Sequence, residues 1–165
     1  MLGKSVPRMD EPFSKDLMGK LLPEMVDYSR ECMVIFLLDS LDYVIYWDEL
    51  YRGTHDNMSI SARDIIMVAL QEKASKVVLV HNHPDGSIDP SPHDIYVTAL
   101  IDVALDIVDL ELLEHYILGD ININKTGWCT GIKDKYSDDM REALKNIGLS
   151  IDIANLIETT IGGTR

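Results

Sequence analysis

The chain has 165 residues, of which 46% are hydrophobic, so a single domain around one core is expected. The chain has 28 acidic and 15 basic residues, which gives a formal charge of −13. A negative charge repels the phosphate groups of nucleic acids, so no direct nucleic-acid binding is expected. No apolar run approaches the roughly 18 residues of a membrane span, and the start lacks a signal-peptide core, so we expect a cytoplasmic protein without membrane contact.

The first expected elements are an arm, a helix and a hairpin. We expect residues 1–13 to form a flexible N-terminal arm, because two prolines interrupt regular structure there. Residues 14–31 have helical spacing, with Pro23 as a break or restart. The apolar runs CMVIFLL at 32–38 and VIYWDEL at 44–50 flank the turn-forming DSLDY, which predicts an antiparallel hairpin.

Helices and strands then alternate. The stretch SARDIIMVALQEKA begins with a Ser-x-x-Asp capping box at Ser61 and Asp64 and predicts a helix over 62–74. KVVLVHN at 76–82 predicts a short buried strand, and LLEHYILGD at 112–120 predicts another. This order of elements indicates the α/β class, with a mixed β-sheet flanked by helices.

The segment between those two strands, residues 92–108, predicts a helix with two different faces. One face is apolar and comprises Ile95, Ala99, Val103 and Ile107. The other is expected to be an acidic stripe that faces solvent, and it comprises Asp94, Thr98, Asp102 and Asp106.

Residues 132–165 are expected to form a C-terminal helical extension. Within it, YSDDMREALKNIG at 136–148 and SIDIANLIETTIGG at 150–163 are typical of short amphipathic helices. Their apolar faces are expected to pack on the domain. The alternative is that they contact a partner or a second copy in a homo-oligomer.

Residues 81–94, HNHPDGSIDPSPHD, hold three of the five histidines and follow a predicted strand. Side chains two residues apart in a strand point to the same face, so His81 and His83 can reach one metal ion. Ser91 at the N-cap and Asp94 at N3 start the next helix, and the turn can bring that carboxylate over the imidazoles. Two imidazoles and one carboxylate leave a fourth position for water, which is typical of catalytic Zn²⁺.

Each part of this pattern also has a simpler explanation. Ser-x-x-Asp is an ordinary capping box, and Ser61 and Asp64 carry the same box with no histidine beside it. A single His-x-His pair can be surface residues or hydrogen-bonded core residues. The combination of two same-face histidines, a turn at Pro84 and Gly86 and a carboxylate opening the next helix favours the metal site.

These residues also resemble a known family. The H-x-H-x7-S-x-x-D signature of the JAMM, or MPN-plus, metallopeptidases is matched by His81, His83, Ser91 and Asp94. HNHPDG followed by PS and D is similar to the RadC-like branch, and the similarity runs in order over residues 31–120. The resemblance implies a JAB/MPN domain, over residues 14–131, with an architecture related to the cytidine deaminases.

The resemblance implies a zinc-dependent metalloprotease that hydrolyses peptide or isopeptide amide bonds in peptide or protein substrates. The family's zinc ligands carry over to His81, His83 and Asp94, where the metal would activate water and polarise the scissile carbonyl. The family's serine carries over to Ser91, whose hydroxyl would hydrogen-bond the oxyanion of the tetrahedral intermediate.

The family's glutamate, which acts as general base, sits just ahead of the first long strand. Glu31, directly before CMVIFLL, matches this position. Asp48 and Glu49 are competing carboxylates, but they lie in WDELYRGT, where acidic residues are typical of an exposed strand end.

Other functions remain as alternatives. His81, His83 and Asp85 fit the start of the metallo-β-lactamase motif H-x-H-x-D-H, but Gly86 replaces its last histidine. A zinc deaminase would need H-x-E and P-C-x-x-C, which are absent. The stronger alternative is a non-catalytic metal-binding JAMM-like module, or an accessory protein in DNA repair or mobile-element processes. Structural roles are expected for the remaining histidines and for the tryptophans, namely His55, His93, His115, Trp47 and Trp128. For His115, which is expected to be a hydrogen-bonded strand residue, the alternative is that it supports a metal ligand.

Overall fold

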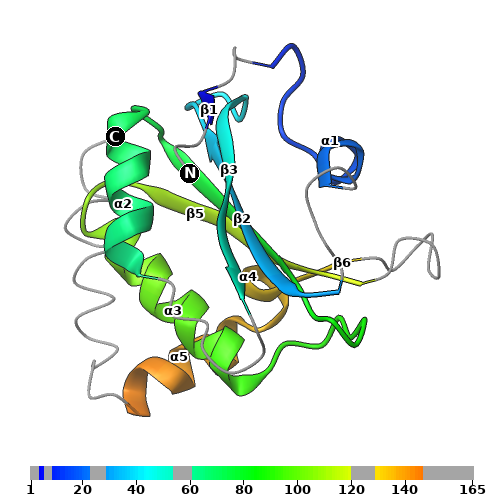
Figure 1. Ribbon diagram of the computed structural model, residues 1–165. Coiled ribbons are helices and arrows are strands. Elements are labelled where there is room, and N and C mark those ends of the chain that lie inside the picture. The colour runs from blue at the N-terminus through cyan, green and yellow to red at the C-terminus, as the bar shows by residue number, and fades with distance from the viewer. Residues whose placement is uncertain (1–3, 6–8, 23–28, 54–60, 120–128, 147–165) are drawn as a thin grey trace.

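The computed structural model describes residues 4–5, 9–22, 29–53, 61–119 and 129–146 (Figure 1). Its elements in chain order are β1 (Lys4–Ser5), α1 (Lys15–Leu21), β2 (Glu31–Leu38), β3 (Val44–Gly53), α2 (Ala62–Gln71), β4 (Lys76–Asn82), α3 (Pro92–Asp106), β5 (Glu111–Leu118), β6 (Cys129–Gly131), α4 (Ile132–Lys135) and α5 (Ser137–Asn146). Helices flank a β-sheet, which confirms the predicted α/β class.

The strands of the described chain form one sheet in the order β1-β3-β2-β4-β5-β6. β4 and β5 are parallel and the other neighbouring pairs are antiparallel, so the sheet is mixed, as predicted. β2 and β3 form the predicted hairpin, with Phe36 opposite Trp47. α3 makes the crossover that a parallel pair requires. The ends of β4 and β5 and the start of β2 therefore lie at the same edge of the sheet.

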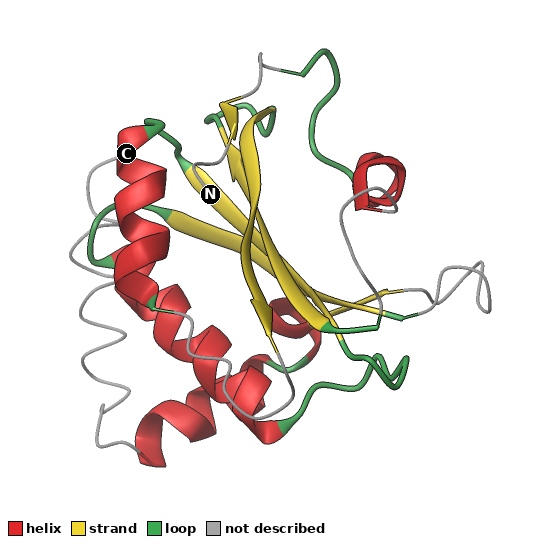
Figure 2. Cartoon of the chain, viewed as in Figure 1, coloured by secondary structure: helices red, strands yellow, loops and turns green. Residues whose placement is uncertain are grey.

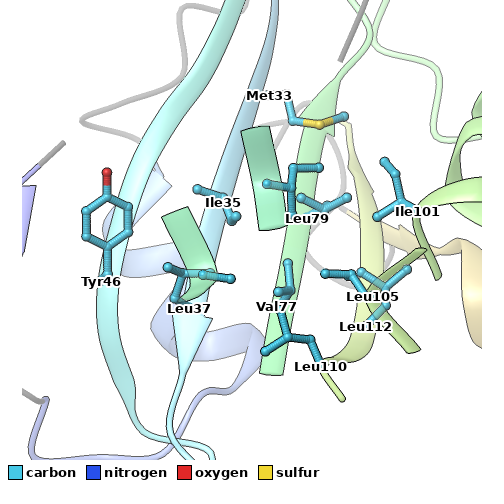
Figure 3. Packing of buried hydrophobic residues seen from close by; sticks show 12 residues of the cluster. Met33, Ile35, Leu37, Tyr46, Val77, Leu79, Ile101, Leu105, Leu110 and Leu112 are labelled. Carbon is cyan, nitrogen blue, oxygen red and sulfur yellow. The ribbon is translucent and has the colours of Figure 1, made fainter. Parts of the chain in front are cut away.

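Both faces of the sheet are covered by helices (Figure 2). α1 covers one face, where the buried side chains include Leu17, Met18, Val34, Phe36 and Val80. α2 and α3 cover the other face of the sheet (Figure 3). The side chains buried there include Ile35, Leu37, Ile65, Leu79, Ile101 and Leu105. Alternate residues of β2 enter different cores, and every residue of β2 after Glu31 is therefore buried.

A third cluster joins the end of the domain to α3. It consists of Ala99, Ile117, Ile132 and Met140, contributed by α3, β5, α4 and α5. The first predicted C-terminal helix is thus present as α5 and packs on the domain through Met140. The second predicted helix, at 150–163, lies outside the described residues.

The predicted solvent-facing acidic stripe on α3 is wrong at its first two positions. Asp94 and Thr98 are buried, with relative exposures of 3% and 0%. Ile107, expected on the apolar face, follows the end of the helix and is 64% exposed. The cause is the polar environment under the first turns of α3, where imidazoles of β4 and β5 supply hydrogen-bonding partners for Asp94 and Thr98.

The helix predicted over 62–74 begins where expected but ends three residues early. Ser61 is the N-cap, yet its side chain makes no capping hydrogen bond, so the predicted box with Asp64 does not form. α2 ends because Lys73 adopts a positive φ of 57°, and the Ala74 N–H donates to the carbonyl of Ala69 at 2.9 Å. This is the Schellman pattern of helix termination.

Parts of the predicted N-terminal arm contact the sheet. Lys4–Ser5 pairs with β3, and the N–H groups of Met9 and Phe13 donate to the carbonyls of Val44 and Asp42. Within the described residues, no helix is long and apolar enough to cross a membrane.

Candidate metal centre

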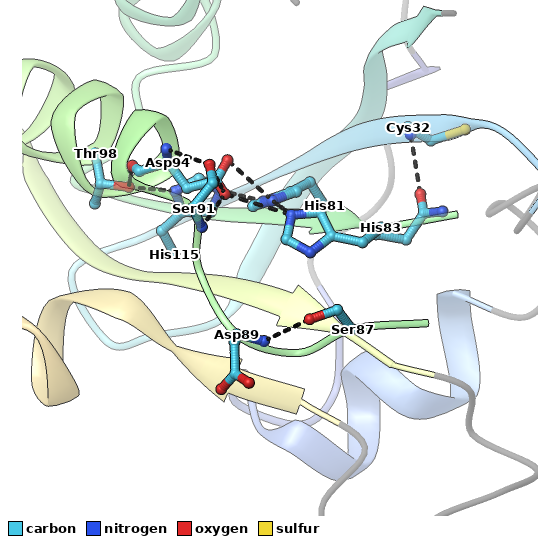
Figure 4. Close-up of polar contacts among 10 residues, drawn as sticks. Cys32, His81, His83, Ser87, Asp89, Ser91, Asp94, Thr98 and His115 are labelled. Atoms are coloured by element: carbon cyan, nitrogen blue, oxygen red, sulfur yellow. Dashed lines mark hydrogen bonds and ion pairs between the residues drawn. The ribbon is translucent and has the colours of Figure 1, made fainter. Parts of the chain in front are cut away.

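His81 and His83 lie at the end of β4, on the face that α3 covers (Figure 4). Val77 and Leu79 pack on that face, and because alternate side chains of a strand share a face, His81 and His83 point to it as well. His81 is 1% exposed and His83 is half-buried. Their Nε2 atoms are 3.1 Å apart, so the structure brings the two imidazoles together as the sequence predicts.

Asp94 approaches the imidazoles from the first turn of α3. The chain turns back at Gly86, whose φ of 77° favours glycine. The predicted capping box forms: Ser91 Oγ accepts from the Asp94 N–H at 3.1 Å, and Asp94 Oδ2 accepts from the Ser91 N–H at 2.8 Å. The carboxylate then lies 3.3 Å from His81 Nε2 through Oδ1 and 3.4 Å from His83 Nε2 through Oδ2.

The spacing of these atoms suits a tetrahedral ion. Metal–ligand bonds of about 2.0–2.1 Å at tetrahedral angles would place the donor atoms about 3.3–3.4 Å apart. The closest separations here are 3.1, 3.3 and 3.4 Å. With one ligand atom taken from each residue, all three atoms lie within 4.8 Å of one another, because Asp94 turns a different oxygen to each ring. The donor set therefore fits a divalent metal ion.

The electrostatics of the cluster favour a bound cation. Burial opposes ionisation of Asp94, but the neighbouring imidazoles of His81 and His83 and the Ser91 hydroxyl hold its pKa well below the usual range. The hydrogen bond to Asp94 raises the pKa of His83 above its ordinary value, although burial opposes this. The carboxylate thus stays anionic and draws positive charge toward the space between the three side chains.

Ser91 lies beside the candidate ligands and has two roles in the structure. Its hydroxyl donates to Asp94 Oδ2 at 2.6 Å, while the same oxygen caps α3. The hydroxyl therefore orients the carboxylate as well as starting the helix. The sequence predicts that Ser91 caps the helix and is compatible with a chemical role as well; the structure shows the cap and the contact with the Asp94 carboxylate.

Glu31 begins β2 and lies on the same side of the sheet as the histidines. Met33 pairs with His81 in the antiparallel register, which places Glu31 opposite His83. Its negative charge is one of those that raise the pKa of His83, after the dominant hydrogen bond that His83 donates to Asp94. The structure thus brings this carboxylate to the rim of the cluster formed by His81, His83 and Asp94.

A model of a known protein family matches the part of the chain that carries the candidate ligands. The family model described as "RadC-like JAB domain" matches residues 13–126, which is more than half of the chain. The chain belongs to the RadC-like JAB domain family. The resemblance inferred from the motif at 81–94 is confirmed.

Curated relatives of this RadC-like JAB domain carry the name UPF0758. A UPF0758 protein of Shewanella sediminis (strain HAW-EB3) is 38% identical over 111 residues, which cover 66% of this chain and 49% of that protein. UPF0758 protein Shew185_0376 of Shewanella baltica (strain OS185) is 37% identical over the same length and the same shares. The chain therefore spans about half the length of the curated relatives it matches.

Asn82, the residue between the two histidines, points to the opposite face and holds the start of β2. Its Oδ1 accepts from the Cys32 N–H at 2.9 Å, and its Nδ2 donates to the Arg30 carbonyl at 2.9 Å. Both contacts are to the backbone on either side of Glu31. The amide side chain thereby ties the Glu31 backbone to the end of β4.

Replacing Asn82 with Ala is expected to lower the free energy of unfolding by about 1–3 kcal/mol, because the buried Cys32 N–H and the Arg30 carbonyl lose their side-chain partner. Urea unfolding measures the change. The matched control is Asn146→Ala, at an exposed position of α5, where a change within about 0.5 kcal/mol is expected. Equal effects of the two substitutions would show that the Asn82 contacts do not stabilise the start of β2.

His115 and Thr98 lie directly behind the candidate ligands. His115 Nε2 is 2.8 Å from His81 Nδ1, and its Nδ1 is 2.7 Å from Thr98 Oγ1. His115 is therefore a hydrogen-bonded strand residue, as the sequence predicts. Thr98 was placed on the solvent face by helical spacing alone, and its proximity to the site was missed.

The competing carboxylates lie further from the cluster. Asp48 pairs opposite Ile35 and Glu49 opposite Val34, so both are displaced along the hairpin from the level of His81 and Met33. Asp48 Oδ2 accepts from the Tyr46 hydroxyl at 3.3 Å. Of the remaining residues given structural roles, His93 is exposed at the start of α3 and Trp47 packs against the α1 side of the core, while His55 and Trp128 lie outside the described residues.

Proposed function

We propose that this RadC-like JAB domain is a zinc-dependent metallopeptidase that hydrolyses peptide or isopeptide amide bonds in a peptide or protein substrate. The observation that carries the proposal is the convergence of His81, His83 and Asp94 at near-tetrahedral separations beside Glu31. Two imidazoles and one carboxylate are the ligand set of open zinc sites in metallopeptidases. Bound zinc would supply Lewis acidity to the scissile carbonyl and to a water molecule.

The chain's own side chains supply the remaining chemistry. Glu31, a half-buried carboxylate on the same face, would accept a proton from water and return it to the leaving amine. Ser91 holds the Asp94 carboxylate by a 2.6 Å hydrogen bond and has a hydroxyl at the rim where an oxyanion would form. His81 is buried and fixed, whereas the half-buried His83 borders the accessible side of the site.

The proposal is tested by measuring metal content and hydrolysis on the same preparation. Elemental analysis of protein refolded or purified with zinc is expected to give one zinc per chain. A library of peptides and of lysine-linked isopeptides is then screened for cleavage, with a chelator-treated sample as the inactive control. A zinc-loaded protein that cleaves none of these substrates would overturn the peptidase assignment and favour the alternative below.

A non-catalytic metal-binding module is the second candidate. The observation that favours it is the Ser91 hydroxyl, whose proton is used on Asp94 and whose oxygen caps α3, so that each of its described contacts is structural. In such a module the metal would stabilise the end of β4 and the start of α3. Zinc would then raise the unfolding temperature without any turnover.

A further inference from the structure

A chain of hydrogen bonds runs from one candidate ligand back to the backbone of another. His81 Nδ1 is 2.8 Å from His115 Nε2, and His115 Nδ1 is 2.7 Å from Thr98 Oγ1. The Thr98 hydroxyl donates to the carbonyl of Asp94 at 2.6 Å. His81, His115 and Thr98 are each at most 1% exposed, so water does not supply alternative partners.

The Asp94 carbonyl, the last acceptor in this series of hydrogen bonds, determines which atom donates at each step. A carbonyl oxygen only accepts, so the single hydroxyl proton of Thr98 is directed to Asp94. The Thr98 oxygen is then left with lone pairs toward His115. Nδ1 of His115 must therefore carry a proton and donate it to Thr98.

His115 is neutral, and this passes the same constraint on to His81. His115 is 1% exposed, and the partners that the described structure gives its ring, Thr98 Oγ1 and His81 Nδ1, carry no negative charge that could offset a buried imidazolium. A neutral imidazole with a proton on Nδ1 has a bare Nε2, which can only accept. His81 must then donate from Nδ1, and Nε2, which faces Asp94 and His83, is the nitrogen left to bind a metal ion.

We infer that Thr98 and His115 are positioning residues that lock the His81 ring in its Nδ1–H tautomer and so present Nε2 as a metal ligand. Neither residue is placed to contact substrate or metal, and both act through His81. The inference rests on the metal site of the proposed function. It explains why a threonine and a histidine are buried directly behind the candidate ligands, next to the apolar core under α2 and α3.

Zinc affinity of the full chain tests the inference. Competition with a chromogenic chelator is expected to show that Thr98→Val, which keeps the shape but removes the hydroxyl, weakens zinc binding by about 10–100-fold. Thr98→Ser, which restores a hydroxyl, is expected to bind zinc within a few-fold of the wild type. The matched control is Thr130→Val at a buried threonine of β6, where no change in zinc affinity is expected.

A spectroscopic readout on metal-free protein separates positioning from simple packing. Long-range ¹H–¹⁵N correlations of the histidine rings are expected to place the proton on Nδ1 of both His81 and His115. Substituting His115 with Gln, whose Oε1 can accept from His81, is expected to retain more zinc affinity than His115→Phe. A wild-type His81 without a proton on Nδ1, or unchanged zinc affinity in Thr98→Val, would overturn the inference.

Failure of the inference and failure of the proposed function are distinguishable. If Thr98→Val binds zinc as tightly as the wild type does, the positioning role is overturned, but the metal site of the proposed function is not. If His81 and His115 of the wild type each carry a proton on Nδ1 but the protein binds no zinc, the hydrogen-bond series is supported and the proposed function is overturned.

Discussion

Replacing Glu31 with Gln is expected to lower kcat for the cleaved peptide by about 10²–10⁴-fold, the usual contribution of a general base, while zinc content stays at one per chain. Gln has nearly the same shape and polarity but cannot accept a proton. Its backbone is held on both sides by Asn82, so the substitution is not expected to move the start of β2. Steady-state kinetics and elemental analysis of the same samples measure both effects.

The matched controls for this substitution are the competing carboxylates of β3. Glu49→Gln and Asp48→Asn remove the same charge from the hairpin but lie opposite Val34 and Ile35 rather than at the level of His83. Both are expected to keep kcat within a few-fold of the wild type. A loss of turnover in either variant, with full turnover in Glu31→Gln, would move the general base from β2 to β3.

Replacing Asp94 with Asn is expected to weaken zinc binding by more than the 10–100-fold that typically follows loss of an outer partner, because it removes the anionic ligand itself. The fold is expected to survive, since an amide oxygen can still accept from the Ser91 N–H and complete the capping box. Chelator competition measures the affinity. Peptide hydrolysis is expected to fall in proportion to the zinc that is lost.

The chain contains its own control for Asp94. Asp64 occupies the same N3 position in α2 but is exposed. Asp64→Asn removes one negative charge from a helix N-terminus without touching the candidate site. If Asp64→Asn and Asp94→Asn bound zinc equally well, the carboxylate at the start of α3 would not be a ligand.

The parts of the fold that follow from local periodicity could be predicted from the sequence. The hairpin, β4 and β5 are short apolar runs bounded by turn residues, and their limits match within one or two residues except where β3 runs on to Gly53. The proximity of His81 and His83 follows from strand alternation. The return of Asp94 follows from a capping box, whose geometry ties the N3 side chain to the N-cap.

What could not be predicted depends on contacts between elements distant in sequence. Helical spacing places Thr98 with the acidic residues of α3, because periodicity cannot tell a buried polar partner from a solvated one. Its burial depends on His115, which reaches it only after β5 pairs in parallel with β4. The Ser61 and Ser91 boxes are identical in pattern, yet only Ser91 forms one in the structure.

The most direct test is a crystal structure of the zinc-loaded protein with anomalous scattering recorded at the zinc edge. The expected result is a single peak about 2.0–2.1 Å from His81 Nε2, His83 Nε2 and one oxygen of Asp94, with a fourth position open to solvent. A peak bound elsewhere, or no peak while these side chains remain well ordered, would contradict the metal centre.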